Sequence, residues 1–282
     1  MKCIRIMILI ATVVVCSVLL GNAQDMKVPD IIAKHLDSIG TKEKRDSVKT
    51  LIARGNSEFE STSPLIKGGG KAIVVSDPDN LFFLMSLNSR EYPFEKIGYF
   101  HGSISIPFIN PGVRSLLGAF VADHEKVLSD GLFAGAMSLR WAAFEEKPKA
   151  KLTSDGIKTI DGKKLYAISV NSSGGGSSEF VIKLYFDPTT FNHVRSEYRY
   201  TVSPQDAVMG QQNRRAAGQL IVTEKFSDFR NVDGLTLPYA YRVEYETNGS
   251  SSGASKNSWA INVTDWFINQ KLAGDFFTFD AK

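Results

Sequence analysis

The residues with the clearest chemical potential are one serine motif and the histidines. Gly249 and Gly253 enclose three serines in the pattern GxSxG, which marks a nucleophilic serine when a strand precedes it and a helix follows it. Strand-like sequence lies on both sides here, so the motif predicts a loop between strands. The four histidines have no metal-ligand spacing. They are His35, His101, His124 and His193. The sequence therefore predicts no catalytic residues, no cofactor and no metal site.

Residues 1–23 have the pattern of a secretory signal peptide. Lys2 and Arg5 precede an apolar run at 6–20, and the small residues at 21–23 suit cleavage. A membrane anchor is the alternative, although the run is short for a span. We expect export to the periplasm. Both cysteines, Cys3 and Cys16, lie in this segment, so residues 24–282 cannot form a disulfide.

The charges of the chain are scattered and nearly balanced. The 33 Lys and Arg residues are matched by 30 Asp and Glu residues, and the basic residues form no patch along the sequence. Nucleic-acid binding proteins gather basic residues on one surface, so this balance predicts no nucleic-acid partner. We expect a monomer in solution.

Residues 24–282 predict a single, mainly β (α+β) domain built on a long antiparallel meander. In 235–247 apolar and aromatic residues occupy every odd position, which is the period of a strand with one buried face. The pairs Asp161-Gly162 and Asp233-Gly234 suit hairpin turns. The apolar parity shifts after Val263, which predicts a bulge near Thr264. We expect about ten or eleven strands.

Other parts of the chain break this pattern. Residues 28–40 predict an amphipathic helix, and residues 61–70 and 171–178 predict loops. Residues 139–144 predict a strand, and the polar run 203–217 predicts a short helix. Near 110–138, apolar residues recur at helical spacing, which predicts a helical lid over the dry face of the sheet. The expected fold is an incomplete antiparallel β-barrel with covering helices.

An apolar interior beneath such a lid would suit an acyl chain, because each buried CH₂ contributes roughly 0.8 kcal/mol. The candidate lining residues come from the lid and from the strands that would face it. They are Leu116, Leu117, Phe120, Val121, Leu132, Phe133, Phe82, Leu84, Tyr198, Tyr200, Tyr239 and Tyr241. The residues alone leave open whether the lid is instead a permanent second layer of the core.

Several segments resemble the LolA-like family of outer-membrane lipoprotein-sorting carriers. They are the strand–turn–strand 180–198, the pair that follows at 224–238, the closing stretch 266–277, the helix at 31–39 and the segment 131–141. The resemblance implies a half-barrel closed by helices around a hydrophobic cavity. It further implies a periplasmic, non-catalytic binding or carrier protein for a lipid or lipoprotein acyl chain, with transient contacts to the membrane or membrane proteins.

One position departs from the family pattern. Asp77 stands where the carriers place an arginine that helps to hold the lid closed, so we expect the lid to be controlled differently. The alternative to a carrier is a structural or protein-interaction module whose barrel is filled by its own side chains. A lipid hydrolase has less support, because no nucleophile–base pair can be recognised.

Overall fold

The computed structural model describes residues 26–141, 144, 150–171, 180–202, 218–249, 253–273, 276 and 277 of the 282-residue chain. The predicted signal peptide at 1–23, the polar run 203–217, the loop after Asn171 and the serines of the GxSxG pattern lie outside the described residues. The elements on either side of that pattern are both strands, as the alternation predicted.

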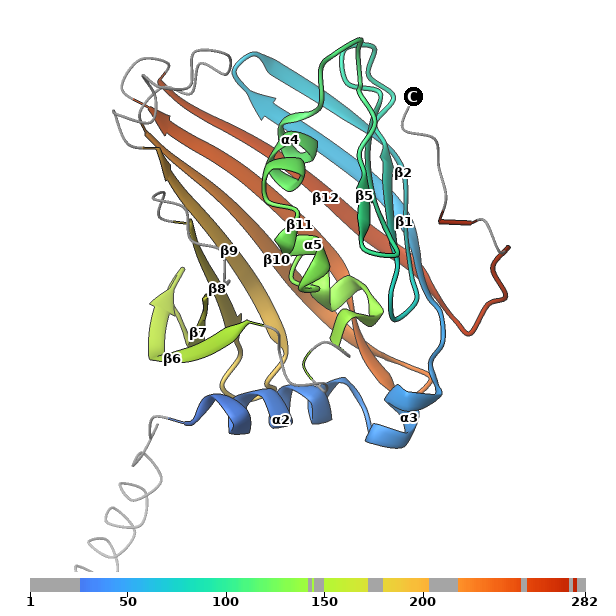
Figure 1. Ribbon diagram of the computed structural model, residues 1–282, viewed down its shortest axis with the longest axis vertical. Coiled ribbons are helices and arrows are strands. Elements are labelled where there is room, and N and C mark those ends of the chain that lie inside the picture. Colours follow the sequence, from blue (N-terminus) through green and yellow to red (C-terminus); the bar gives the residue numbers. More distant parts are fainter. Residues whose placement is uncertain are drawn as a thin grey trace, which may run out of the picture.

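The described residues form one antiparallel sheet of twelve strands. They are β1 (Leu51–Thr62), β2 (Leu65–Ser76), β3 (Leu81–Ser86), β4 (Phe94–Phe100), β5 (Ser103–Ser105), β6 (Lys151–Ile160), β7 (Lys163–Asn171), β8 (Phe180–Phe186), β9 (His193–Val202), β10 (Gly218–Val232), β11 (Leu235–Gly249) and β12 (Gly253–Ile268). Their order across the sheet is β5-β4-β3-β2-β1-β12-β11-β10-β9-β8-β7-β6. The sheet is curved but not closed, with β5 and β6 as its edges (Figure 1). The predicted open, mainly β architecture is confirmed.

The local signals in the sequence account for the register of the long strands. Asp233 and Gly234 both have positive φ, at 49° and 83°, as a tight two-residue hairpin turn requires. Asp161 and Gly162 do the same, at 50° and 77°. Thr264 is the extra residue of a bulge, because its neighbours Val263 and Asp265 pair with the consecutive residues Gly55 and Arg54. These predictions are confirmed.

Two of the predicted elements are wrong. Residues 65–70 belong to β2 instead of a loop. Their glycines are needed in the strand, because a Cβ on Gly68 would lie 2.5 Å from the Leu87 carbonyl oxygen. Residues 139–141 form a short 3₁₀ helix instead of a strand. There the Leu139 N–H donates to the Ser76 hydroxyl (3.0 Å), a side-chain acceptor, and not to the backbone of a neighbouring strand.

The helices are short and lie against the sheet. They are α2 (Val28–Ile39), α3 (Lys42–Ser47), α4 (Leu116–Asp123), α5 (Lys126–Ser129) and the 3₁₀ turns η2 (Gly135–Met137) and η3 (Leu139–Trp141). The predicted helix α2 crosses one end of the sheet (Figure 1) and buries Ile31 and Leu36. Arg45 of α3 donates to the Leu36 carbonyl (2.8 Å), which satisfies the end of α2. Among the described residues, no helix combines the length and apolar character needed to cross a membrane.

The strand order explains why a segment of the chain covers the sheet. The chain leaves the sheet at β5, on one edge, and re-enters it at β6, on the opposite edge. The intervening chain must therefore cross the sheet, and α4 and α5 lie in front of β10–β12 on the concave side (Figure 1). We call residues 106–141 the covering segment. It contains the lid predicted near 110–138.

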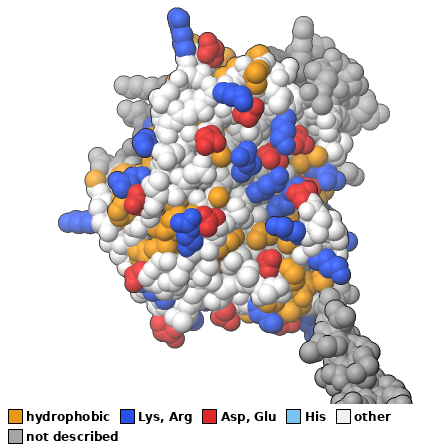
Figure 2. Space-filling model, turned by 180° about the vertical axis from the view of Figure 1, so that it is seen from behind, with side chains coloured by type: hydrophobic (Ala, Val, Ile, Leu, Met, Phe, Trp, Pro, Cys, Tyr) orange, Lys and Arg blue, Asp and Glu red, His pale blue; other side chains and the backbone are white. Residues whose placement is uncertain are grey.

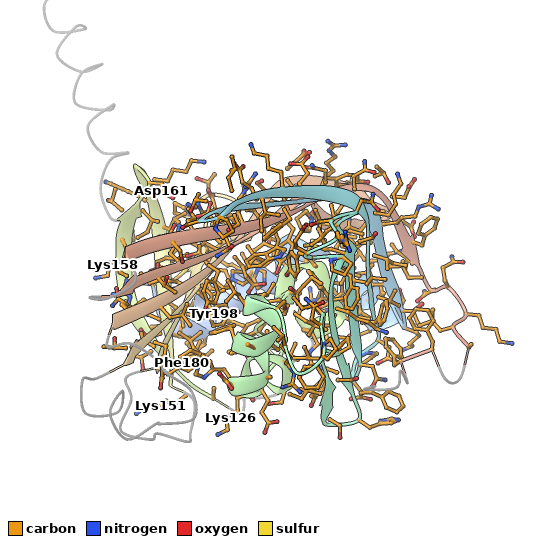
Figure 3. All side chains as sticks on the ribbon, turned by 90° about the horizontal axis from the view of Figure 1, so that it is seen from above. Lys126, Lys151, Lys158, Asp161, Phe180 and Tyr198 are labelled. Carbon is orange, nitrogen blue, oxygen red and sulfur yellow. The ribbon has the colours of Figure 1, made fainter. Side chains whose placement is uncertain are left out.

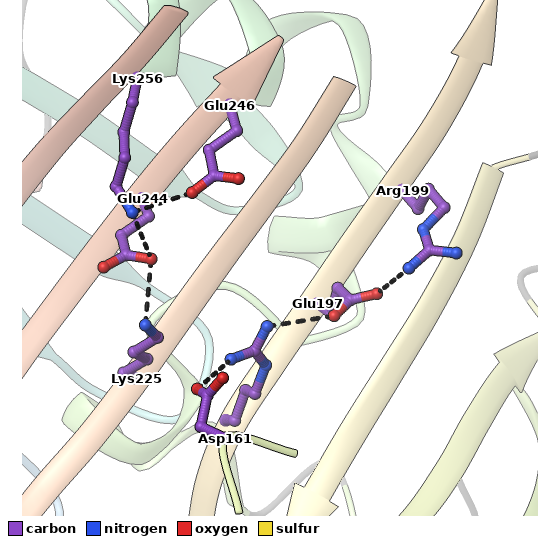
Figure 4. A network of polar contacts seen from close by, with 8 residues as sticks. Asp161, Glu197, Arg199, Lys225, Glu244, Glu246 and Lys256 are labelled. Carbon is purple, nitrogen blue, oxygen red and sulfur yellow. Dashed lines mark hydrogen bonds and ion pairs between the residues drawn. The ribbon is translucent and has the colours of Figure 1, made fainter. Parts of the chain in front are cut away.

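The convex face of the sheet is charged and carries both signs (Figure 2). Two ladders of ion pairs lie on this face, one along β9 and one across β10, β11 and β12 (Figure 4). In the first, Arg195 contacts Asp161 (3.3 Å) and Glu197 (3.2 Å). In the second, Glu244 contacts Lys225 (3.0 Å) and Lys256 (3.2 Å). Interspersed opposite charges of this kind keep a broad sheet face soluble.

Candidate functional site

The interior between the sheet and the covering segment is the candidate site. Five of the predicted lining residues from the covering segment are buried there. Leu117, Val121 and Phe133 are 0% exposed, Phe120 is 3% and Leu132 is 4% exposed. The covering segment thus fills the concave face with its own side chains in this structure.

Aromatic contacts join the covering segment to the strands beneath it. The Phe133 ring lies 5.8 Å from the ring of Phe83, and the Phe120 ring lies 5.8 Å from that of Tyr198. Such edge-to-face pairs add about 0.5–1.5 kcal/mol each beyond the area they bury. Seen from above, Tyr198 and Phe180 lie beside the covering helices (Figure 3).

Other predicted lining residues lie elsewhere. Leu116 is 47% exposed on the outer side of α4. The inward positions of β3 are Leu81, Phe83 and Met85, all 0–2% exposed, so Phe82 and Leu84 point to the opposite face. The prediction that Phe82 and Leu84 face the interior is therefore wrong, because it placed the wrong set of alternate residues of β3 on the inner face.

The remaining tyrosines divide between the core and its margin. Tyr198 and Tyr241 are fully buried, at 0% and 1% exposure. Tyr200 is half-buried, with its ring 5.2 Å from that of His124 at the end of α4. Tyr239 is half-buried under the Arg230 guanidinium, which lies 4.2 Å from the ring centre.

Glu224 is the acceptor that Tyr198 and Tyr241 share. Both hydroxyls donate to its carboxylate at 2.6 Å, and the carboxylate is 0% exposed. A third donor is the backbone N–H of Ala134 in the covering segment, at 2.7 Å. Burial raises the pKa of Glu224, and the donated hydrogen bonds oppose that rise. This carboxylate is therefore one polar anchor between the sheet and its cover.

Glu95 on β4 is a second buried anchor, on the same concave face but near the β5 edge of the sheet. Its carboxylate is 1% exposed and accepts hydrogen bonds from the Tyr92 hydroxyl and from the Ser115 hydroxyl (2.8 Å). Ser115 is the N-cap of α4, where it also accepts from the Gly118 N–H (2.8 Å). Burial raises the pKa of Glu95 to about 7, against the lowering effect of the Tyr92 and Ser115 hydrogen bonds.

Arg140 is the third anchor, and it acts within the covering segment. Its guanidinium donates to the carbonyls of Leu128 (2.7 Å) and Ser129 (2.9 Å), at the end of α5. It also donates to the Pro78 carbonyl (3.3 Å) in the turn between β2 and β3. In that turn the Asp77 carboxylate accepts hydrogen bonds from the backbone N–H groups of Asp79 and Asn80, at 2.9 and 2.8 Å. The Asp77 side chain therefore stabilises the turn itself.

A buried serine and histidine raise the question of hydrolysis. The Ser196 hydroxyl lies 3.1 Å from Nε2 of His193, and both residues are within 0–3% exposure. However, Nε2 also faces the Arg195 carbonyl oxygen at 3.0 Å. A carbonyl oxygen only accepts, so Nε2 must carry the proton and cannot serve as a base for Ser196. Burial lowers the pKa of His193 to about 3, which keeps the ring neutral.

Hollows lie beside and outside this region in the described part of the chain. A partly enclosed cavity of about 20 Å³, room for about one water molecule, lies between α2, η2–η3 and the strand ends. Its lining includes His35, Ile39, Trp141, His193, Phe229 and Leu237. An open groove of about 540 Å³ lies on the outside, bordered by the chain after β12, and no predicted lining residue contributes to it. No group of three potential metal ligands occurs among the described residues.

Comparisons with known proteins give structural matches only. No family model and no curated protein sequence matches the chain. A LolA superfamily protein from Nitrosomonas europaea superposes with a TM-score of 0.49 at 12% identity, over 90% of this chain and 98% of that one. The chain resembles it in fold.

Two further structures resemble the chain to a similar degree. A DUF1329 family protein from Desulfovibrio piger has a TM-score of 0.43 at 10% identity, over 89% of this chain and 97% of that one. A putative outer membrane lipoprotein-sorting protein domain from Vibrio parahaemolyticus has the same TM-score and identity, over 87% and 95%. The resemblance expected from the sequence is thus also found between structures, and at these identities it concerns the fold alone.

The three anchors were not found by sequence reasoning, although two of them left a signal. Glu224 occupies an inward position of the alternating run Leu220, Val222, Glu224, Phe226, and Glu95 precedes the inward Ile97. A charged residue at an apolar position of a strand is costly unless it is hydrogen-bonded, so it indicates a buried partner. The signal does not say which partner.

Proposed function

We propose that the protein binds the acyl chain of a lipid or lipoprotein on the concave face of its sheet, and that the covering segment moves away to admit it. The proposal is of a periplasmic, non-catalytic binding or carrier protein. The observation that carries it is the placement of residues 106–141 across an apolar concave face, between the two edges of the sheet.

The covering segment is built so that it can leave without unfolding the sheet. Its helices and 3₁₀ turns contribute no strand to the sheet. It is held instead by apolar side chains and by separate polar contacts at Glu95, Glu224, Ser76 and Pro78. Movement would therefore break side-chain contacts while the strand ladders stay intact, as in lids and other segments of low local stability.

An acyl chain could replace what the covering segment now supplies. The exposed concave face would present Phe83, Tyr198 and Tyr241, which now contact Phe120, Phe133 and one another. A chain of ~16 carbons gains on the order of 10 kcal/mol when buried, at roughly 0.8 kcal/mol per CH₂. That gain is comparable with the burial of several large side chains, so the exchange of lid for ligand is energetically reasonable.

Chain length is the test of this proposal. Native mass spectrometry of the detergent-free protein should first show co-purified lipid. Competition with acyl compounds of increasing length should then strengthen binding by up to ~0.8 kcal/mol, about fourfold, per methylene until the site is full. Glu244→Gln on the convex face is the matched control and should leave this dependence unchanged. Absence of both bound lipid and length dependence would refute the proposal.

A self-filled scaffold is the second candidate, and one observation favours it. The covering segment already fills the interior, with Leu117, Val121 and Phe133 at 0% exposure. In that case Phe120→Asp would bury an unpaired charge and cost several kcal/mol of stability. If the segment is a lid, the same change should abolish acyl binding while the strands keep their melting transition. Melting temperature measured beside binding separates the two.

A further inference from the structure

The contact between Glu224 and the covering segment has a direct consequence for the ligand. The carboxylate receives two hydrogen bonds from the sheet, from Tyr198 and Tyr241, both at 2.6 Å. It receives its third from the Ala134 N–H, at 2.7 Å, which belongs to the segment that must leave. Removal of the covering segment therefore takes one donor away from a buried acceptor.

The donor that leaves is attached to an apolar group. Ala134 follows Phe133, whose ring lies 5.8 Å from that of Phe83 on the concave face of β3. Ala134 has φ 53°, a left-handed conformation that is unfavourable for a residue other than glycine. The covering segment thus presents a hydrogen-bond donor beside a hydrophobic body, in a backbone conformation that the contact with Glu224 helps to hold.

The remaining partner of Glu224 on the sheet is Ser196, which lies opposite it across strands β9 and β10 and lowers its pKa through a side-chain hydrogen bond. The Ser196 hydroxyl also lies 3.1 Å from Nε2 of His193. The groups that face Glu224 are hydroxyls and one amide, and each of them donates. An incoming group that only accepts, such as an ether, ester or carboxylate oxygen, would leave the acceptor short of a donor or repel it.

We propose that Glu224, flanked by Tyr198 and Tyr241, is the receptor for the polar end of the ligand, and that this end carries a hydrogen-bond donor such as a hydroxyl or ammonium group. The inference rests on the proposed function, because it requires the ligand to take the place of residues 132–134. It assigns the ligand to the amphiphiles with a donor head group. A pure hydrocarbon or an alkyl ester would bind more weakly.

Head-group competition at constant chain length tests the inference on the full-length protein. A primary alkyl alcohol, the corresponding alkylamine and the methyl ether of the alcohol would each displace a fluorescent acyl probe. The alcohol and the amine should bind about tenfold more tightly than the ether, since the ether leaves a buried acceptor without a donor. Tighter binding of the amine than of the alcohol would identify an ammonium as the preferred donor.

Variants at the two buried carboxylates assign the effect to one of them. Glu224→Gln keeps an acceptor oxygen but removes the charge and introduces a donor, so the advantage of alcohol and amine over ether should shrink severalfold. Glu95→Gln is the matched control, and it should leave the ranking of head groups unchanged. If Glu224→Gln fails to fold, Tyr241→Phe replaces it. With one internal donor fewer, Glu224 should then prefer donor ligands more strongly.

The possible failures are distinguishable. Equal binding of alcohol and ether by the wild-type protein would overturn the head-group inference while acyl binding stands. A head-group preference that persists in folded Glu224→Gln would overturn the role of Glu224. If no compound displaces the probe whatever its head group, the proposed function itself fails, and the inference fails with it.

Discussion

Glu224 and Lys225 are neighbours in β10, but they lie on opposite faces of the sheet and in different physical environments. Glu224 is 0% exposed on the concave face, where its partners are two tyrosines and a backbone amide. Lys225 is 36% exposed on the convex face, where it pairs with Glu244 at 3.0 Å. On the buried concave face a charge is tolerated only when protein groups satisfy its hydrogen bonds. On the convex face water solvates the exposed charges and weakens the ion pairs.

The charges on the two faces therefore have different roles: those on the concave face position the covering segment, and those on the convex face solvate the sheet. The concave charges, Glu95 and Glu224, each connect the sheet to the covering segment. The convex ladder of Lys225, Glu244 and Lys256 connects β10, β11 and β12 (Figure 4), and its two lysines are 36% and 46% exposed. Changes at the concave face should therefore alter stability and the position of the cover, and changes at the convex face should do little.

Adjacent phenylalanines in β3 give the largest expected contrast. Phe83→Ala on the concave face, where Phe83 is 0% exposed, should lower the free energy of unfolding by about 3–5 kcal/mol through lost burial and a cavity. Phe82→Ala on the opposite face, where the residue is half-buried, should cost about 1 kcal/mol. Denaturant unfolding of both variants measures the difference. Equal losses would show that the assignment of faces is wrong.

The pH dependence of Glu95 gives an effect of intermediate size. Its pKa in the folded protein is raised to about 7 from 4.5, so the folded state holds a proton that the unfolded chain has lost between these values. The stability associated with this proton is present below pH 4.5 and is lost as the pH rises through 7. Glu95→Gln mimics the protonated form of Glu95, so the stability of this variant should not fall as the pH rises through 7.

Unfolding of wild-type protein and Glu95→Gln across the pH range tests this sign. The variant should match the wild type below about pH 4.5 and be more stable near about pH 8, by on the order of 3 kcal/mol. The pKa values of His35 and His193, lowered by burial to about 4 and about 3, produce the opposite trend below pH 6.5. Both histidines are present in both proteins, so the difference isolates Glu95. A pH-independent difference would contradict the assignment.

The convex ladders give the smallest expected effect. Although partial burial pushes the pKa of Glu244 up, its contacts with Lys225 and Lys256 lower it overall. Its side chain is 14% exposed, but those of its partners are 36% and 46% exposed. Glu244→Gln should therefore cost at most about 1 kcal/mol, less at high salt. A loss as large as that of Phe83→Ala would show that the two faces do not differ as described.

The sequence predicted the sheet well because its signals are local. Alternation predicted β11, the Asp-Gly pairs predicted the turns at Asp161 and Asp233, and a parity shift predicted the bulge at Thr264, all of which the structure shows. Each of these depends on a few neighbouring residues. The errors have a non-local cause. The glycines of 68–70 read as a loop, but they serve the close approach of the chain at Ser86 and Leu87.

The candidate site was predicted in outline only. The covering segment and most of its inward residues could be identified, because helical spacing is visible in 116–128. The anchors could not, since the partners of Glu224 and Glu95 lie on other strands and depend on the strand order. The parity of β3 was also undecided by sequence, because Phe82, Phe83, Leu84 and Met85 are all apolar.

The central claim is that the covering segment and an acyl ligand compete for the concave face. Hydrogen exchange of the backbone amides, with and without a saturating acyl ligand, tests this most directly. We predict faster exchange on binding across residues 116–141, including the Ala134 amide that now donates to Glu224, while the amides of β10–β12 stay protected. Unchanged or slower exchange in 116–141 with ligand bound would show that the segment never leaves the sheet.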